Sequence, residues 1–281
     1  MQGERAQSVA ARPRATLSLS EPPAWLLVAL GIVYVAALAV VTLLPGGTLL
    51  DRLRALDGGI CAQLPTHSFF FDGQQLPLCS RNTGIYSGFA ATLLVIWATG
   101  RQRASRLPGK WVAIVLGLAV LAMAVDGFNS LFLDLGLPHL YQPHNLLRLI
   151  TGLGTGTAMA AFIVPVTNSV MWQDEDGRST FGSLRDVALM LPVLLMVFLA
   201  DSSEVAVLLY PIAVLSSVGL ILALTCINMV LALSFSPVAG RFTRWRQVLV
   251  LFSGAVVLAV VELMGLFALK SSLMAVLLTH R

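Results

Sequence analysis

Apolar runs of membrane-spanning length follow one another along this chain. Seven are apparent, at residues 24–44, 83–100, 111–125, 146–171, 187–200, 205–235 and 248–269. The first has no charged residue over 21 positions, enough for a helix to cross a hydrocarbon core of about 30 Å. A secretory signal would have an apolar region of about 7–15 residues, so we interpret this run as a retained first span.

Two of the seven runs are short. The third ends at Asp126 or continues towards Leu133, and the fifth contains Pro192. A tilted or re-entrant segment is an open alternative to a full span for both of them. We therefore predict an all-α, polytopic integral membrane protein with about seven transmembrane helices.

Composition agrees with a membrane protein. Of the 281 residues, 57% are hydrophobic and 11% are charged, and the mean hydropathy is +0.84. Soluble domains are about 25% charged, which disfavours a soluble enzyme. The net charge of +4 comes from basic residues scattered over short loops, which indicates a lipid bilayer rather than nucleic acid as partner.

The distribution of Lys and Arg predicts the orientation. With a cytoplasmic N-terminus, the inner segments hold twelve basic residues and the outer ones six. The inner set is Arg5, Arg12, Arg14, Arg101, Arg103, Arg106, Lys110, Arg178, Arg185, Arg241, Arg244 and Arg246. This bias follows the positive-inside rule and predicts a multi-pass protein of the cell membrane with the loop between the first two spans outside.

Three regions follow from this organisation. Residues 1–23 are a basic tail without apolar periodicity, which predicts disorder. Residues 24–170 form a membrane domain with an outer loop at 45–82, and residues 171–281 add three further helices.

The stretch from Cys61 to Gly88 is the main polar island of the chain. Before it, apolar residues recur at helical spacing over 49–60 and predict a short amphipathic helix ended by Asp57-Gly58-Gly59, although an irregular loop is as compatible with so few residues. Within it, Asp72-Gly73 between apolar-rich runs predicts a β-hairpin with a type I′ turn.

The hairpin is expected to bring Cys79 towards Cys61. On an outer, oxidising face the two thiols predict a disulfide, which would close its loop with a gain of about 3 kcal/mol. The alternatives are a redox-active dithiol or two metal ligands. Cys226, in the sixth run, is expected to be a packed, inert thiol.

The motif Cys79-Ser-Arg-Asn-Thr-Gly-Ile-Tyr resembles the signature of the domain-of-unknown-function 2085 family of predicted bacterial and archaeal membrane proteins. The resemblance covers about residues 50–165. The matching positions are Cys61, Gln63, Pro65, Ser68, Phe69, Gln75, Pro77, Cys79, Arg81, Thr83, Gly84, Ile85, Tyr86, Gly88, Asp126, Gly127, Asn145, Arg148, Thr151 and Gly152. The family has no established function to carry over.

Two departures from that signature bear on metal binding. The family pattern has His where this chain has Ala62, and Cys where it has Asn82. The full pattern implies four ligands suited to zinc, whereas this chain keeps two thiols. The resemblance therefore implies a metal or thiol site in relatives, but the two replacements weaken that hypothesis for this chain. A metal site here would need further ligands from His67, His139, His144 or Asp126.

Polar residues at the predicted membrane boundary are the candidate ligand-binding residues. They are Arg81, Asn82, Tyr86, Asp126, Asn129, Asn145 and Arg148. An unpaired charge near the hydrocarbon is costly, so we expect Asp126 to pair with Arg148. That pair is either a clamp between two spans or the floor of an outward-facing pocket in which Arg148 holds an anionic group.

Two intramembrane features complete the candidates. Glu262 lies deep in the seventh run, where it is either a proton-coupling carboxylate or a group hydrogen-bonded to Asn228 or Ser253. Gly152, Gly156 and Ala160 form a line of small residues, which predicts close helix packing within the chain or with a partner subunit.

These features support three classes of function. The first is a multispanning protein whose outer face binds a small ligand or a partner, with a transporter as one version. The second is a membrane enzyme that uses Cys61 and Cys79 for thiol-redox or metal chemistry, and the third is a structural subunit of a larger complex. No catalytic residue or cofactor is indicated by a motif.

Overall fold

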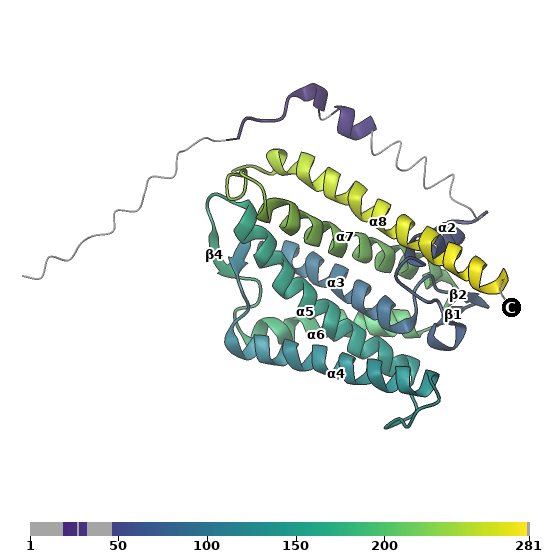
Figure 1. Cartoon of the computed structure of the whole chain (residues 1–281). Coiled ribbons are helices and arrows are strands. Elements are labelled where there is room, and N and C mark those ends of the chain that lie inside the picture. The colour runs from purple at the N-terminus through teal and green to yellow at the C-terminus, as the bar shows by residue number, and fades with distance from the viewer. Residues whose placement is uncertain (1–18, 27, 33–46, 280–281) are drawn as a thin grey trace, which may run out of the picture.

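The computed structural model describes residues 19–26, 28–32 and 47–279. Six long helices run alternately up and down in a bundle (Figure 1). They are α3 (Ser80–Ala98), α4 (Lys110–Asp134), α5 (Asn145–Met171), α6 (Leu184–Ser202), α7 (Leu209–Ser234) and α8 (Trp245–Thr279). Each corresponds to one of the last six predicted runs.

The remaining predictions at the N-terminus are only partly covered. Residues 24–26 and 28–32 of the predicted first span are helical, and its other residues lie outside the described part of the chain. Of the predicted disordered tail, residues 1–18 are likewise outside it.

Four helical segments are long and apolar enough to cross a membrane. They are Lys110–Asp134, Asn145–Met171, Ala206–Ser234, in which the 3-10 turn η2 (Ala206–Leu208) precedes α7, and Trp245–Leu277. α3 and α6 are shorter, with 19 residues each, and both have polar residues at their ends, such as Arg81 and Asp186. The prediction of seven spans therefore stays a prediction.

The two short runs of the sequence are parts of longer helices. α4 continues through Asp126 to Asp134, and α6 continues through Pro192 to Ser202. Asp126, Asn129 and Ser130 lie on one face of α4 and are buried, while much of the rest of that helix is exposed.

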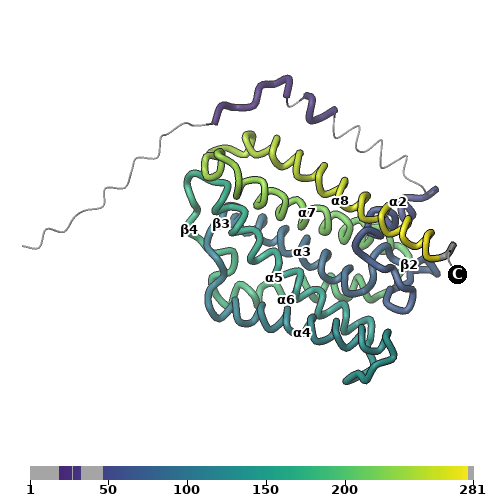
Figure 2. The backbone as a smooth tube through the Cα atoms, viewed as in Figure 1, coloured from purple at the N-terminus to yellow at the C-terminus, as the bar shows by residue number. Residues whose placement is uncertain are grey.

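α3 lies in the centre of the bundle and packs against α5, α6 and α7 (Figure 2). Glycines permit this approach: a Cβ atom on Gly156 of α5 would collide with the Ile85 carbonyl oxygen, and one on Gly219 of α7 with that of Tyr86. The predicted small-residue line Gly152, Gly156 and Ala160 thus packs inside the same chain.

The two ends of the bundle are built differently. We call the end that carries residues 49–79 the loop end. It contains α2 (Leu49–Asp57), the 3-10 turn η1 (Pro65–His67) and the antiparallel strands β1 (Phe70–Phe71) and β2 (Gln74–Gln75). Positive φ angles of 49° at Asp72 and 73° at Gly73 confirm the predicted hairpin turn.

α2 forms as predicted and is capped at Gly58, but it is more than a surface helix. The Thr48–Asp51 capping box begins it, and its residues Leu50, Leu56 and Asp57 are buried. α2 packs against α7 and α8, and Leu56 contacts Leu220 and Leu263 in one apolar cluster.

The opposite end, which we call the β3–β4 end, has two short parallel strands. β3 (Ala104–Arg106) pairs with β4 (Asp176–Ser179). The sequence analysis did not predict them, because Asp-Gly-Arg-Ser has no apolar alternation and the pairing joins residues about 70 positions apart.

Candidate functional site

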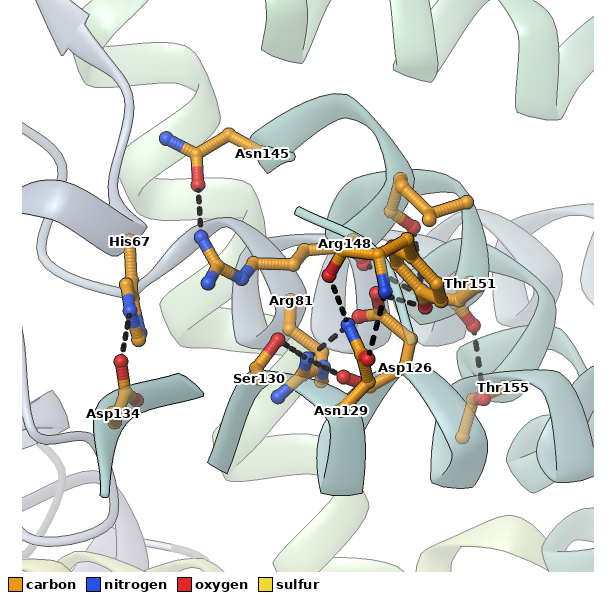
Figure 3. Close-up of polar contacts among 12 residues, drawn as sticks. His67, Arg81, Asp126, Asn129, Ser130, Asp134, Asn145, Arg148, Thr151 and Thr155 are labelled. Carbon is orange, nitrogen blue, oxygen red and sulfur yellow. Dashed lines mark hydrogen bonds and ion pairs between the residues drawn. The ribbon is translucent and has the colours of Figure 1, made fainter. Parts of the chain in front are cut away.

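An ion pair between α3 and α4 lies at the loop end (Figure 3). The Arg81 Nη2 atom is 2.6 Å from Asp126 Oδ2 and also donates to Ser130 Oγ, while Tyr141 Oη donates to Asp126 Oδ1. Asp126 is only 1% exposed. The prediction that Asp126 pairs with Arg148 is wrong. Arg81, in the first turn of α3, faces the buried side of α4 and forms the ion pair with Asp126 instead.

Asn129 fixes the connection that follows α4. Its Oδ1 accepts from the Leu140 backbone N–H at 2.7 Å, and its Nδ2 donates to the Tyr141 carbonyl at 2.8 Å. These bonds hold Tyr141 against Asp126. Asn129 is therefore committed to positioning this connection, and its amide has little capacity left for a ligand.

Arg148 is a buried cation without a carboxylate partner. It is 4% exposed, its Nη1 donates to Asn145 Oδ1 at 2.8 Å, and its Nε has no hydrogen-bond partner. No carboxylate among the described residues lies within 4.0 Å of its guanidinium. Figure 3 shows the side chain extending from α5 towards the space between Asn145 and His67.

Arg148 lines an open pocket of about 440 Å³ at the loop end. The polar walls come from three parts of the chain: η1, the start of α5 and the end of α6. The other lining residues are Thr66, Phe69, Pro143, His144, Asn145, Leu146, Ser202 and Glu204. Asn145 also donates to the carbonyls of Thr66 and Ser68, so η1 is fastened to the pocket's edge.

His67, at the end of η1, contacts α4. Its Nε2 lies 3.3 Å from Asp134 Oδ1. Burial lowers the pKa of His67, and the nearby positive charge of Arg148 lowers it further, against the opposing effect of Asp134. At neutral pH the imidazole is thus biased towards the neutral form, so His67 adds little positive charge near Arg148.

Cys61 and Cys79, both at the loop end, are free thiols, so the predicted disulfide is wrong. The Cys61 sulfur accepts backbone N–H groups of Cys79 at 3.2 Å and Gln63 at 3.4 Å. Hydrogen bonds replace the expected covalent staple: Gln63 donates to the Arg54 and Pro77 carbonyls, and Arg54 donates to the Gln75 carbonyl.

The thiols of this pair have unequal acidity. The hydrogen bond from the Cys79 thiol, assisted by the two backbone donors, lowers the pKa of Cys61 to about 6. The same interaction, together with burial, raises the pKa of Cys79. Because Cys61 is 3% exposed, this thiolate character is enclosed beneath α2 and the loop.

Sequence reasoning missed two residues beside this pair. Asp57 is fully buried, accepts from Ser217 Oγ of α7 at 2.7 Å, and its Oδ1 has no hydrogen-bond partner. Burial raises the pKa of Asp57 to about 7. Lys270 of α8 donates to the Gly58 and Cys61 carbonyls. In the sequence, Asp57 was interpreted only as part of a helix end. The signal that could have identified it is that it is a charged residue in a helix at the membrane boundary.

The candidate residues therefore divide into two groups on different sides of α3. Arg81 of α3 faces Asp126 and Asn129 of α4, with Arg148 and Asn145 of α5 beside them. Asn82 lies near Cys61, and Tyr86 packs among Leu56, Leu220 and Leu263. Arg148 lines the pocket of about 440 Å³, whose lining does not include Cys61, Cys79 or Asp126.

Glu262 has one of its two expected partners. Asn228 Nδ2 of α7 donates to Glu262 Oε2 at 3.0 Å, whereas Ser253 donates to the Leu249 carbonyl. As for metals, no group of three or more His, Cys, Asp or Glu residues among those described is arranged to hold an ion.

Comparison with known proteins gives a family without an assigned activity. The DUF2085 model, described as a predicted membrane protein, matches residues 61–162. An uncharacterized protein of Methanocaldococcus jannaschii is 34% identical over 114 residues, which are 41% of this chain and 67% of that protein. One of Methanothermobacter thermautotrophicus is 34% identical over 104 residues, 36% of this chain and 81% of the relative.

No solved structure matches the chain. The matched region runs from Cys61 through α3 and α4 into α5, so it includes Arg81, Asp126 and Arg148. The resemblance seen in the motif around Cys79 is thus confirmed. The chain belongs to the DUF2085 family of predicted membrane proteins.

Proposed function

We propose that this protein is a seven-span protein of the cell membrane that binds a small anionic ligand at Arg148, on the outer side. The observation that carries the proposal is the state of Arg148: a buried guanidinium with an unpartnered Nε beside an open pocket. A buried unpaired charge destabilises a protein by roughly 3–5 kcal/mol. An anionic ligand bound at Arg148 would supply the missing counter-charge.

The chemistry of the pocket favours a carboxylate or a phosphate. A guanidinium presents its donors in a planar fork that matches the two oxygens of either group. Thr66, His144 and Asn145 add hydroxyl, imidazole and amide groups around it. Glu204 also lines the pocket, and its carboxylate limits the negative charge that the pocket accepts, which favours small ligands of low charge.

The distribution of basic residues supports the orientation. Of the basic residues that the structure describes, nine lie at the β3–β4 end and five at the loop end. The nine are Arg101, Arg103, Arg106, Lys110, Arg178, Arg185, Arg241, Arg244 and Arg246. The positive-inside rule then gives a cytoplasmic β3–β4 end and an outer loop end.

The binding test uses the purified full chain in detergent. Thermal unfolding is followed with and without millimolar phosphate, sulfate, acetate and glutamate. We expect at least one anion to raise the Tm, Arg148→Met to abolish the shift, and Arg148→Lys to weaken binding about tenfold because Lys lacks the bidentate fork. Arg52→Met is the matched control, since Arg52 lies at the same end and outside the pocket lining.

Two results would overturn the proposal. One is that none of these anions shifts the Tm of the native chain. The other is that Arg148→Met retains the full shift in Tm, which would show that the anion binds at a different site.

The state of Cys61 favours a second candidate function, thiol chemistry beneath α2. The hydrogen bonds from the Cys79 thiol and from the backbone N–H groups of Cys79 and Gln63 lower the pKa of Cys61, which favours the thiolate form. Iodoacetamide labelling of the folded chain, resolved by peptide mass spectrometry, tests it. We expect Cys61 to be alkylated at pH 7 before Cys226, with a rate that falls below pH 6. Alkylation of Cys61 only after unfolding would exclude this function.

A further inference from the structure

A carboxylate in the last turn of α6 is buried inside the bundle without a partner. Asp201 is 1% exposed, and both of its carboxylate oxygens lack a hydrogen bond. Among the described residues, no Lys, Arg or His side chain lies within 4.0 Å of it. Burying an unpaired ion is unfavourable, so the Asp201 carboxylate requires a positive charge that these residues do not supply.

A buried hydroxyl on α3 lies beside this carboxylate. Ser87 is fully buried, and it is the neighbouring side chain that interacts with the Asp201 carboxylate. Its Oγ atom also lacks a hydrogen-bond partner, so the two groups are neighbours that are not bonded to each other. Oxygen atoms that share a bound cation have this relation, because each of them points at the ion.

Asp57 shows the alternative arrangement of a buried carboxylate and a serine. It also lies buried at the end of a helix, α2, but Ser217 Oγ of α7 donates to its Oδ2 atom at 2.7 Å. A direct hydrogen bond of this kind is thus compatible with the packing of this bundle. Its absence between Ser87 and Asp201 distinguishes that pair and leaves three buried oxygen atoms directed at one region between α3 and α6.

The end of α6 further favours a positive charge at this place. Asp201 lies in the last turn, where the helix dipole puts partial negative charge. The Ser203 N–H donates to the Ala200 carbonyl and does not continue the helical pattern to Leu199, so α6 ends with carbonyl groups that the helix does not satisfy. Helix C-terminal ends supply ligands for Na⁺ in membrane proteins.

We propose that Asp201 and Ser87 bind an alkali-metal cation, Na⁺ or K⁺, between α6 and α3. One positive charge balances the one carboxylate, and the ligand atoms are hard oxygens that suit such an ion. A divalent ion usually takes more carboxylates, and no group of three His, Cys, Asp or Glu residues among those described is arranged to hold one. A proton would also neutralise Asp201, but it would bond only one of the two carboxylate oxygens.

Cation binding at this place uses neither Asp201's neighbours in the anion pocket nor Arg148. Ser202 and Glu204, which follow Asp201 in the chain, line that pocket, whereas Asp201 and Ser87 do not. The cation site and the anion site can therefore exist without each other, and each is tested by its own ion.

Thermal unfolding of the purified full chain in a neutral detergent tests this site. Choline chloride is replaced stepwise by NaCl or KCl at constant pH and ionic strength. At a concentration ten times the dissociation constant, we expect the bound ion to raise the Tm by about 3 °C. Asp201→Asn is expected to abolish the shift, and Ser87→Ala to weaken binding about tenfold because the ion loses one oxygen ligand. Asp57→Asn, the matched buried carboxylate at a helix end, is the control and is expected to retain the shift.

The salt that gives the larger shift identifies the ion, and binding of its radioactive form to the native chain measures occupancy directly. We expect a single bound ion per chain, displaced by the unlabelled salt and not by choline chloride. Three outcomes would overturn the proposal: neither salt shifts the Tm beyond choline chloride, Asp201→Asn keeps the full shift, or the Tm depends on pH and on neither salt, which would assign a proton to Asp201. If Asp201→Asn does not accumulate, Ser87→Ala decides, and an unchanged affinity for the labelled ion would overturn the site.

Discussion

The two ends of this bundle handle buried polar groups in opposite ways. At the β3–β4 end, Asn168 of α5 donates to the carbonyls of Gln102 and Ala104 and accepts from Trp172 Nε1. Thr180 donates to the Ala161 carbonyl, and Arg101 binds both the Thr180 carbonyl and Asp186. Each of these side chains ties a loop to a helix.

At the loop end, buried polar atoms are left without partners. Nine buried side-chain atoms in the described part of the chain lack a hydrogen bond, and all but Gln102 Oε1 belong to residues at or near the loop end. They include Asp57 Oδ1, Arg148 Nε and both carboxylate oxygens of Asp201. Buried polar groups are normally satisfied, so this contrast agrees with the anion site proposed at the loop end.

The largest expected effect is a loss of stability when the Arg81–Asp126 ion pair at the loop end is broken. Asp126→Asn removes the carboxylate that faces Arg81 and is expected to cost about 4 kcal/mol of unfolding free energy, because it leaves a half-buried guanidinium unpaired. Denaturant unfolding in detergent measures it. Asp176→Asn, in the exposed Asp176–Arg178 pair, is the control, with an expected change below about 0.5 kcal/mol. Equal costs at the two sites would contradict the buried pairing.

The next effect is a pH dependence from Asp57. Burial raises the pKa of Asp57 from 3.8 for a free side chain to about 7 in the folded chain. The folded form therefore holds the proton over this interval, so stability falls as pH rises from about 4 to 7, by at most about 1.4 kcal/mol per pH unit. Cys61 and Tyr86 are the titratable neighbours.

Asp57→Asn isolates that contribution. The substitution is expected to match the native chain at pH 4 and to exceed its stability at pH 8 by about 3 kcal/mol, because no carboxylate then has to ionise in the interior. Unfolding curves at pH 4, 6 and 8 measure the difference. A constant difference across this range would assign the pH dependence to another group.

Asn168→Ala is expected to have a smaller cost, about 2 kcal/mol, since two carbonyls and one indole N–H lose a partner. Unfolding in detergent measures it, and the anion-dependent shift in Tm is expected to be unchanged. Loss of anion binding in this variant would contradict the assignment of anion binding to the loop end alone, since Asn168 is not among the residues that line the pocket.

The smallest expected change in stability is that of Arg148→Met. Without added anion, the unfolding free energy is expected to stay within about 1 kcal/mol of the native value or to rise, because an unpaired buried charge is replaced by an apolar chain. A loss as large as that of Asp126→Asn would instead identify Arg148 as a structural clamp.

Local signals in the sequence were reliable in this protein. The apolar runs correspond to α3 through α8, and Asp72-Gly73 forms the hairpin because few other residue pairs adopt positive φ twice in succession. The partner of Glu262 was among those expected, since Asn228 is one of few polar side chains in the neighbouring span. The failures concern pairs from distant segments: Asp126 with Arg81, Cys61 with Cys79, and β3 with β4.

The sequence was enough to predict a helical membrane protein, the positions of helices α3 to α8 and the hairpin turn at Asp72-Gly73, because hydropathy and backbone preference act over a few residues. Which arginine neutralises Asp126 depends on how distant helices pack together. Gly84, Gly88, Gly152 and Gly156 let α3 and α5 approach closely, and this contact sets the rotation of both helices. That rotation directs Arg81 to α4 and leaves Arg148 unpaired beside the pocket.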